Sequence, residues 1–153
     1  MNWTDRIALV ALAAVGFVAC QSTSKPAALD SRNEQCQTCR MIVSDAARAS
    51  QIVAPYEEAR FFDDLSCLSS YITAHPLASG AVIYVADHRT REWVRWDQAV
   101  YTRALAPGGA MGSPVVAHAS VGSRDADPAA AGGTPVDVRD VFPASATRGS
   151  GGH

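Results

Sequence analysis

The feature that most limits what this chain can fold into is an apolar run near its start, IALVALAAVGFV, at residues 7–18. A helix that crosses a bilayer needs about twenty apolar residues, so this run is too short to span a membrane. Arg6 precedes it, and the charged flank and short apolar core are those of a secretory signal peptide. We therefore predict that residues 1–19 are a signal peptide that takes no part in the fold.

The end of this run predicts a lipid anchor. Ala19 precedes Cys20, as at the lipobox of bacterial lipoproteins, although Phe17 stands where an aliphatic residue is usual. Acyl chains on such a cysteine contribute about 0.8 kcal/mol per buried CH₂. We predict a periplasmic protein anchored to a membrane through Cys20, and Gln21 weakly favours the outer membrane over the inner one. An ordinary cleaved signal peptide is the alternative.

Composition divides the rest of the chain into three parts. Residues 20–33 are polar and aperiodic, and predict a flexible tether. Residues 143–153 are rich in Gly, Ser and Ala, and predict a disordered tail. Residues 34–142 remain, which is enough chain for one modest core. The formal net charge of -2 argues against nucleic acid, because a nucleic-acid-binding protein needs a basic face.

The hydrophobic pattern of this domain predicts short strands and helices. Helices are expected over residues 63–75, capped by Asp63 or Asp64, and over residues 97–105, capped by Asp97, with a glycine-rich loop at 106–114. Strands are expected at residues 41–45, 50–54, 59–62, 80–87, 91–96, 115–120 and 134–142. Two stretches are alike, FFDDLSCLSSYI and VRWDQAVYTRAL, since each places Asp and a helix after aromatic residues. We predict an α+β fold made of two similar small ββαβ halves packed as one unit.

The chemistry of the chain is concentrated in CQTCRM, residues 36–41, which holds three sulfur atoms. Cys36 and Cys39 converge if the backbone turns between them. If residues 39–41 are extended, the side chains of Cys39 and Met41 point the same way, because strand side chains have a period of two. With Cys67, the domain has an odd number of cysteines, so at least one thiol is left outside a disulfide.

Several chemistries compete for this motif. Haem attachment needs C-x-x-C-H, which Arg40 and Met41 exclude. Structural zinc usually takes two ligand pairs, and the chain has one C-x-x-C. A thioredoxin-like dithiol normally lies at a helix N-terminus, whereas no helix is predicted directly after this motif; a structural disulfide also stays open. Thiolate and thioether sulfur together favour Cu(I), and Met41 has little use in the other sites.

Other residues are weaker candidates. Met111 lies in the glycine-rich loop GGAMGSP, where it has little core to fill, so it is either an exposed thioether ligand or incidental. Cys67 flanks the apolar face of its predicted helix, and we expect it in the core. His88 and His118 could add a ligand, although ordinary polar roles are expected for both. No phosphate-binding loop and no catalytic triad spacing is present.

Five segments, in this order, resemble the NosL family: CQTCRM, FFDDLSCL, VIYVAD, WVRWDQAVY and GAMGSPVVAHAS. NosL proteins are copper-binding lipoproteins accessory to nitrous oxide reductase, and the resemblance covers about residues 34–142. This chain departs from the family pattern at three positions. Arg40 replaces the glycine of C-x-x-C-G-M, Ala110 replaces the proline before the loop methionine, and His118 stands where an aromatic residue is usual.

The resemblance implies a lipid-anchored Cu(I) chaperone, not an enzyme, that supplies the copper centre of nitrous oxide reductase. The family's cysteine ligand corresponds to Cys36 or Cys39, its loop methionine to Met111, and Met41 is part of the motif. The family fold is described as two similar ββαβ halves. The rival prediction is a periplasmic thiol-disulfide oxidoreductase that uses Cys36 and Cys39.

Overall fold

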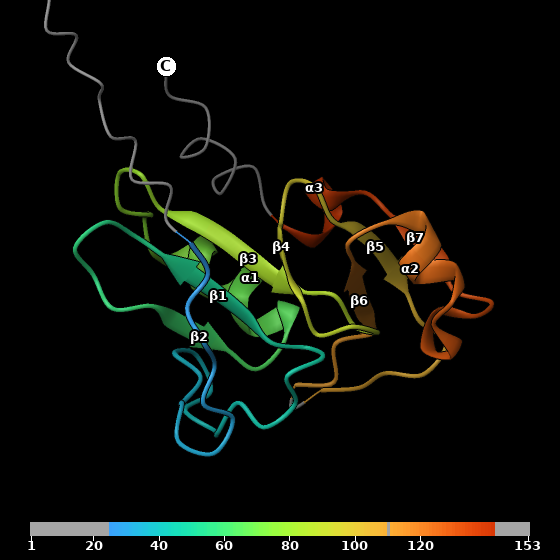
Figure 1. Ribbon diagram of the computed structural model, residues 1–153, viewed down its shortest axis with the longest axis horizontal. Helices are drawn as coiled ribbons and strands as arrows, with labels where there is room; N and C mark the ends of the chain where they lie inside the picture. The colour runs from blue at the N-terminus through green and yellow to red at the C-terminus, as the bar shows by residue number, and fades with distance from the viewer. Residues whose placement is uncertain (1–24, 110, 143–153) are drawn as a thin grey trace, which may run out of the picture.

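The computed structural model describes residues 25–109 and 111–142 (Figure 1). These residues form two antiparallel sheets and several short helices, so the predicted α+β class is confirmed. None of the helices in these ranges is long and apolar enough to cross a membrane. The predicted signal peptide, the anchor Cys20 and the predicted tail at 143–153 lie outside the described residues.

The first sheet has four antiparallel strands in the order β2-β1-β3-β4. In β1, Ser50 lies opposite Phe62 on one side and Val85 on the other. The strands expected at 50–54, 59–62, 80–87 and 91–96 all form, each trimmed at its ends. They are β1 (Ser50–Val53), β2 (Arg60–Phe62), β3 (Val82–Ala86) and β4 (Trp93–Arg95).

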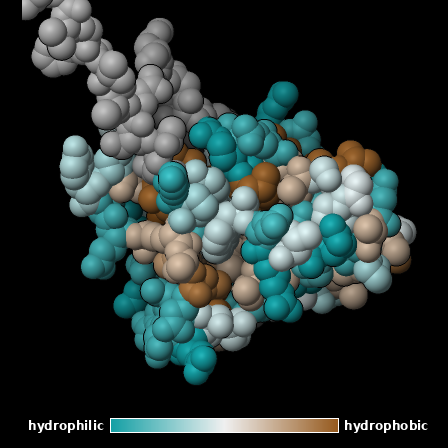
Figure 2. Space-filling view, viewed as in Figure 1, coloured by the Kyte–Doolittle hydropathy of each residue, from teal (hydrophilic) through white to brown (hydrophobic). Residues whose placement is uncertain are grey.

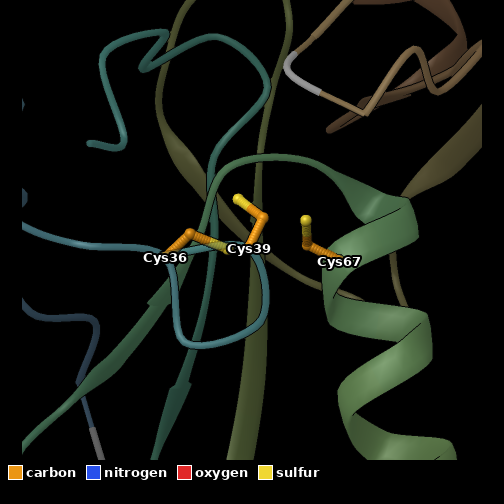
Figure 3. Close-up of side chains that lie close together, drawn as sticks. All are labelled: Cys36, Cys39 and Cys67. Carbon is orange, nitrogen blue, oxygen red and sulfur yellow. The ribbon is translucent and has the colours of Figure 1, made fainter. Parts of the chain in front are cut away.

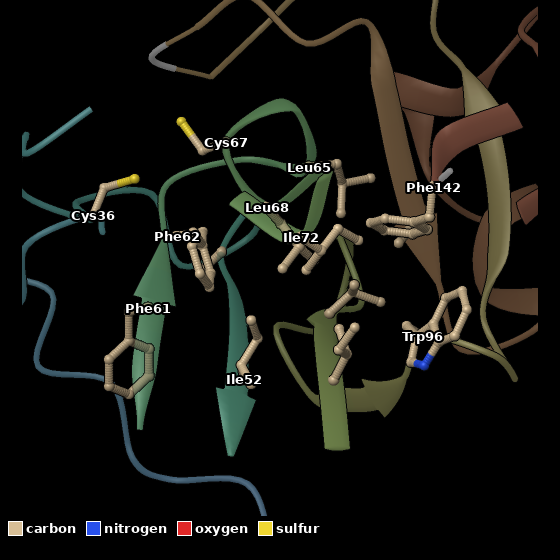
Figure 4. Close-up of a cluster of buried hydrophobic side chains, with 14 of the residues drawn as sticks. Cys36, Ile52, Phe61, Phe62, Leu65, Cys67, Leu68, Ile72, Trp96 and Phe142 are labelled. Carbon is tan, nitrogen blue, oxygen red and sulfur yellow. The ribbon is translucent and has the colours of Figure 1, made fainter. Parts of the chain in front are cut away.

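Helix α1 (Leu65–Ala74) packs on this sheet, as the sequence predicts. Asp64 is the N-cap, and its side chain accepts a hydrogen bond from the backbone N–H of Cys67 at 2.9 Å. Leu68 and Ile72, one helical turn apart, are buried against the sheet (Figure 4). Burying two such side chains contributes about 1.5–3 kcal/mol each. The helix ends at Ala74, and its C-cap His75 directly precedes a proline, which cannot continue the helix.

The second sheet has three antiparallel strands in the order β6-β5-β7. Its strands are β5 (Val100–Arg103), β6 (Val115–His118) and β7 (Thr134–Val136). Short helical elements accompany them: α2 (Val121–Asp125), the 3-10 turn η2 (Pro128–Ala130) and α3 (Val138–Val141). Aromatic rings from segments that follow β4 and α3 meet in one core, where Trp96 packs edge-to-face on Phe142 with centroids 5.3 Å apart (Figure 4).

One predicted element is wrong in this region, and another is too long. The helix expected over 97–105 is instead strand β5, because Val100, Tyr101 and Thr102 are β-branched or aromatic and pair with strands on both sides. The Tyr101 hydroxyl also donates to the Trp96 carbonyl at 2.7 Å. The strand expected over 134–142 ends at Val136, where the next residue caps α3.

The sequence likeness on which two halves were predicted therefore does not hold, because one of its two stretches forms a strand rather than a helix. The element orders can still be compared. The chain runs β1-β2-α1-β3 and later β5-β6-α2-β7, and in each run the first strand lies between the other two.

The N-terminal approach to the domain is fixed to the first sheet. The Ala27 N–H donates to Gln51 Oε1 at 2.8 Å, and Gln51 Nε2 donates to the Ala27 carbonyl at 3.1 Å. The Gln51 side chain is buried, and Ala27 and Leu29 pack against the core. The second half of the segment that was expected to be a tether thus lies against the domain.

The described surface carries no large apolar band on the face shown in Figure 2, where hydrophobic residues form small separate groups among hydrophilic ones. Among the described residues, the exposed large hydrophobic side chains include Met41, Ile42 and Met111. Met41 and Met111 lie in the segments that the sequence analysis identifies as candidate ligand sites, and Ile42 directly follows the first of these segments.

Candidate metal centre

The CQTCRM motif forms a small closed loop. Gln35 and Ile42 make an isolated antiparallel bridge, the Cys36 N–H donates to the Met41 carbonyl at 2.8 Å, and the Arg40 N–H donates to the Cys36 carbonyl at 3.0 Å. The strand expected at 41–45 is reduced to this one bridge. The loop returns the backbone on itself and so brings both cysteines of the motif to one side.

Arg40 makes this loop possible at a conformational cost. Its φ is 65°, in the left-handed region that glycine adopts freely and other residues adopt with strain. Residues 39–41 are therefore not extended, and the condition under which the side chains of Cys39 and Met41 would point the same way is not met. The left-handed backbone also explains in physical terms why a glycine fits this position of the family pattern.

Two hydrogen bonds hold the loop against the first sheet and its helix. The Gln37 N–H donates to the Phe61 carbonyl in β2 at 3.0 Å. The Thr38 hydroxyl donates to the Cys67 carbonyl in the first turn of α1 at 2.8 Å. These contacts join segments that are far apart in the sequence, and they bring Cys67 next to the motif.

The result is a group of three thiols. The sulfur atoms of Cys36, Cys39 and Cys67 all lie within 4.8 Å of one another, and the three cysteines are free (Figure 3). Cys36 and Cys67 are buried, and Cys39 is half-buried. An ion about 2.3 Å from each sulfur would separate the sulfurs by about 4 Å, which this spacing accommodates.

Cys67 is the candidate metal ligand that the sequence reasoning missed. It is buried, as expected of a core cysteine, but its sulfur belongs to the thiol group rather than to apolar packing alone. Two signals pointed to it. The odd number of cysteines left one thiol unexplained, and Cys67 lies in FFDDLSCL, one of the five segments that carry the family resemblance.

The thiols differ in how readily they ionise. Burial alone would raise the pKa of Cys36, but the backbone N–H groups of Cys39, Asp63 and Thr38 more than offset burial and lower it. Burial raises the pKa of Cys39, and the neighbouring Cys36 adds to this. Burial raises the pKa of Cys67 strongly, and the neighbouring Cys36 raises it further. The surroundings thus favour ionisation of Cys36 over ionisation of Cys39 and Cys67.

The loop of Met111 is attached to the same helix terminus. The Met111 N–H donates to Asp64 Oδ2 at 3.1 Å, while Oδ1 of the same carboxylate accepts from the Cys67 N–H. Arg48 Nη1 donates to the Ser113 carbonyl at 3.2 Å. Gly109 has φ +79°, and a Cβ there would lie 3.1 Å from the Asp64 side chain, so only glycine fits without strain.

Both methionines of the predicted site have accessible side chains. Met41 is 44% exposed and Met111 is 56% exposed, so neither thioether is packed into the core. Met41 lies in the thiol loop and Met111 lies in the loop that Asp64 holds. The structure therefore brings the backbones of both predicted thioether residues to the region of the thiols and leaves their side chains accessible.

The two histidines considered as further ligands do not join the thiols. His88 and His118 form a second group with Asp127, in which the ligand atoms again lie within 4.8 Å of one another. The described residues therefore contain two separate sets of potential metal ligands, one of sulfur only and one of nitrogen and oxygen.

Comparison with known proteins gives one match. The family model of NosL matches residues 26–146, which is most of the chain. No curated protein and no solved structure matches. The match begins next to Ala27, the residue whose backbone is bound to the first sheet.

Proposed function

Since the chain belongs to the NosL family, we propose that it is a Cu(I) chaperone that holds the ion between the sulfurs of Cys36, Cys39 and Cys67. Membership implies a copper-related role in the maturation of nitrous oxide reductase and an accessory protein rather than a catalyst. The proposed cargo is a single Cu(I) ion destined for the copper centre of that enzyme. The observation that carries the proposal is the convergence of three free thiols on one buried place.

Sulfur-only coordination supports Cu(I) as the ion. Thiolates are soft ligands and favour Cu(I) over harder ions. Structural zinc sites normally close with four ligands, whereas this group contains three cysteines and, within the described ranges, no fourth Cys, His or carboxylate. Cu(I) is stable with two or three sulfur ligands, so the group as it stands suffices for Cu(I).

Met41 and Met111 are proposed as thioether ligands that capture and release the ion. A thioether is neutral and donates weakly, so a stronger acceptor can displace it. Both side chains are exposed, and the Met111 loop is held by the carboxylate that also caps the helix of Cys67. Copper could therefore pass from the buried thiols to the thioethers, and from there to an acceptor at the surface.

The predicted anchor completes the proposal. We place the protein in the periplasm, attached to a membrane through acyl chains on Cys20, with nitrous oxide reductase or its assembly machinery as the partner. The sequence around Cys20 and the family support this assignment.

We also propose that the domain consists of two similar ββαβ halves. The matching order of the elements and the central position of β1 and β5 support this proposal.

The test is an anaerobic Cu(I) titration of the reduced protein against a competing chelator. Cys67→Ser removes one sulfur at nearly constant volume, and we expect Cu(I) affinity to fall at least tenfold, about 1.4 kcal/mol. Ser70→Ala, an exposed change on the same helix, is the matched control and should not alter affinity. Unchanged affinity in both Cys36→Ser and Cys67→Ser would remove the thiol group as the copper site.

The second candidate is the thiol-disulfide oxidoreductase. It is favoured by the asymmetry of the dithiol, because the pKa of Cys36 is lowered while that of Cys39 is raised, as for a nucleophile and its partner. Dithiol exchange needs two sulfurs only. An oxidoreductase would therefore keep its turnover in Cys67→Ser and in Met111→Leu, whereas a copper chaperone would lose affinity in both.

A further inference from the structure

A second group of side chains lies at the junction of the two sheets. His88 follows the end of β3, His118 is the last residue of β6, and Asp127 follows α2. The His88 N–H donates to the Ala117 carbonyl at 2.8 Å, which fixes the end of one sheet against a strand of the other. Three separate segments thus meet at a fixed point of the fold, and that of His88 is distant along the chain from the other two.

One carboxylate oxygen faces both imidazole rings. His88 Nδ1 lies 2.7 Å from Asp127 Oδ2, and His118 Nε2 lies 2.9 Å from the same oxygen. The other oxygen, Oδ1, accepts from the Ala129 N–H at 2.9 Å. That bond fixes the orientation of the carboxylate, so Oδ2 is directed at the two rings.

The burial of His118 is difficult to explain by packing alone. Its side chain is completely buried, and its Nδ1 has no hydrogen-bond partner among the described residues. An unpaired polar group in such a place costs about 1–3 kcal/mol. An apolar side chain of similar shape would fill the same space without this cost.

We propose that His88, His118 and Asp127 form a second metal site, independent of the thiols, for a divalent ion of borderline softness such as Zn(II) or Cu(II). Two imidazole nitrogens and one carboxylate oxygen are the ligands that such ions prefer, and a water molecule would complete four-coordination. The site goes beyond the proposed Cu(I) function, because its nitrogen and oxygen ligands differ in softness from the sulfurs. One protein could then hold a monovalent and a divalent ion at the same time.

The rearrangement needed for binding is small. Ligands 2.0–2.2 Å from an ion lie about 3.4 Å apart, so each ring nitrogen must withdraw from Oδ2 by roughly half an ångström. The His88 side chain is 17% exposed and provides both the freedom to move and a path from solvent.

The protons can also be accounted for. Each ring now donates a hydrogen bond to Oδ2 through the proton on its facing nitrogen. A neutral ring can bind the ion once that proton is carried by its other nitrogen, and a doubly protonated ring releases one proton to solvent. In His118 the other nitrogen, Nδ1, lacks a partner in either state, so binding creates no new unpaired group.

The experiment isolates this site from the thiols. The reduced, full-length protein is first saturated with Ag(I), a redox-inert soft ion that occupies the sulfurs, and is then titrated with Zn(II). Long-range ¹H–¹⁵N spectra report each histidine ring separately. We expect about one equivalent of Zn(II) to shift Nδ1 of His88 and Nε2 of His118. In a parallel arm with Cu(II), electron paramagnetic resonance should show coordination by nitrogen and oxygen, and competition between the ions identifies the preferred one.

Asp127→Asn keeps the size of the side chain and removes its charge, and it should weaken binding of the divalent ion at least tenfold. His75→Gln, an exposed histidine at the end of α1, is the control and should leave affinity unchanged. The proposal is overturned if neither ion perturbs the rings of His88 and His118 in the wild-type protein. It is equally overturned if Asp127→Asn and His88→Gln both bind the ions as the wild type does.

Discussion

Replacing Asp64 by asparagine separates two roles that one carboxylate performs. In the wild type, Oδ1 accepts from the Cys67 N–H at the start of α1, and Oδ2 accepts from the Met111 N–H at 3.1 Å. Asparagine keeps an oxygen for the helix cap but presents an NH₂ group to Met111, where two donors then face each other. Asp64→Asn should therefore keep the helix and release the methionine loop.

The expected magnitudes follow from these two bonds. A hydrogen bond to a charged, buried group contributes about 1.5–3 kcal/mol, so Asp64→Asn should lower the free energy of unfolding by about 2 kcal/mol. Asp64→Ala also loses the cap, which costs about 1 kcal/mol more. Asp64→Ser is intermediate, because its hydroxyl can cap the helix but cannot reach both donors. Urea denaturation of the reduced apo-protein measures all three variants.

Copper affinity supplies the second measurement. If the position of the loop matters for the site, Cu(I) affinity should fall by a similar factor in all three Asp64 variants, whatever their stability. Asp64→Asn should then resemble Met111→Leu in a chelator competition. Wild-type affinity in a clearly destabilised Asp64→Asn would show that the loop is not part of the copper site. Wild-type stability in Asp64→Ala would refute the capping argument itself.

Three further predictions concern other parts of the molecule. Arg40→Gly relieves a left-handed backbone and should stabilise the apo-protein by about 0.5 kcal/mol in urea denaturation, because the strain of about 1 kcal/mol exceeds the added chain entropy; a loss of stability would contradict this. Burial opposes ionisation of Asp87, yet backbone N–H groups including that of Ala119 lower its pKa to about 2 from 3.8. Its stabilisation, on the order of 2 kcal/mol, should be present above about pH 4 and lost as pH falls towards 2, and Asp87→Asn should flatten this part of the pH profile. Cys20→Ser should release the protein from membrane fractions, and a wild type without acyl mass would end the lipoprotein prediction.

The sequence predicts local structure well where one pattern has one meaning. The apolar run of β3, the alternation in β4 and the aspartate cap of α1 each lead directly to the observed element. Strand β5 was missed because Asp97 after an aromatic residue is a typical helix start, while the β-branched residues that follow it favour a strand only weakly. Pairing with β6 and β7 decides between the two, and no pattern within the segment reveals those partners.

In the candidate site, too, some residues could be predicted from the sequence and others depend on tertiary contacts. Cys36 and Cys39 are close in sequence, so their proximity could be predicted from the chain alone. Cys67 joins them only through tertiary contacts such as the bond from Thr38, and a single cysteine beside an apolar helix face looks like core. Asp127 had no motif around it, and its role depends on the meeting of three separate segments.

If Cys20 carries the proposed lipid anchor, the attachment of Ala27 to Gln51 sets the distance over which the domain can reach a partner. With acyl chains on Cys20, only the seven peptide steps from Cys20 to Ala27 separate the bilayer from the sheet, a span of at most about 25 Å. The domain would therefore occupy a thin layer above the lipid head groups. Encounters with a membrane-held acceptor would then take place almost in two dimensions, at a high effective concentration, whereas a freely diffusing acceptor would have to approach the membrane surface to receive copper.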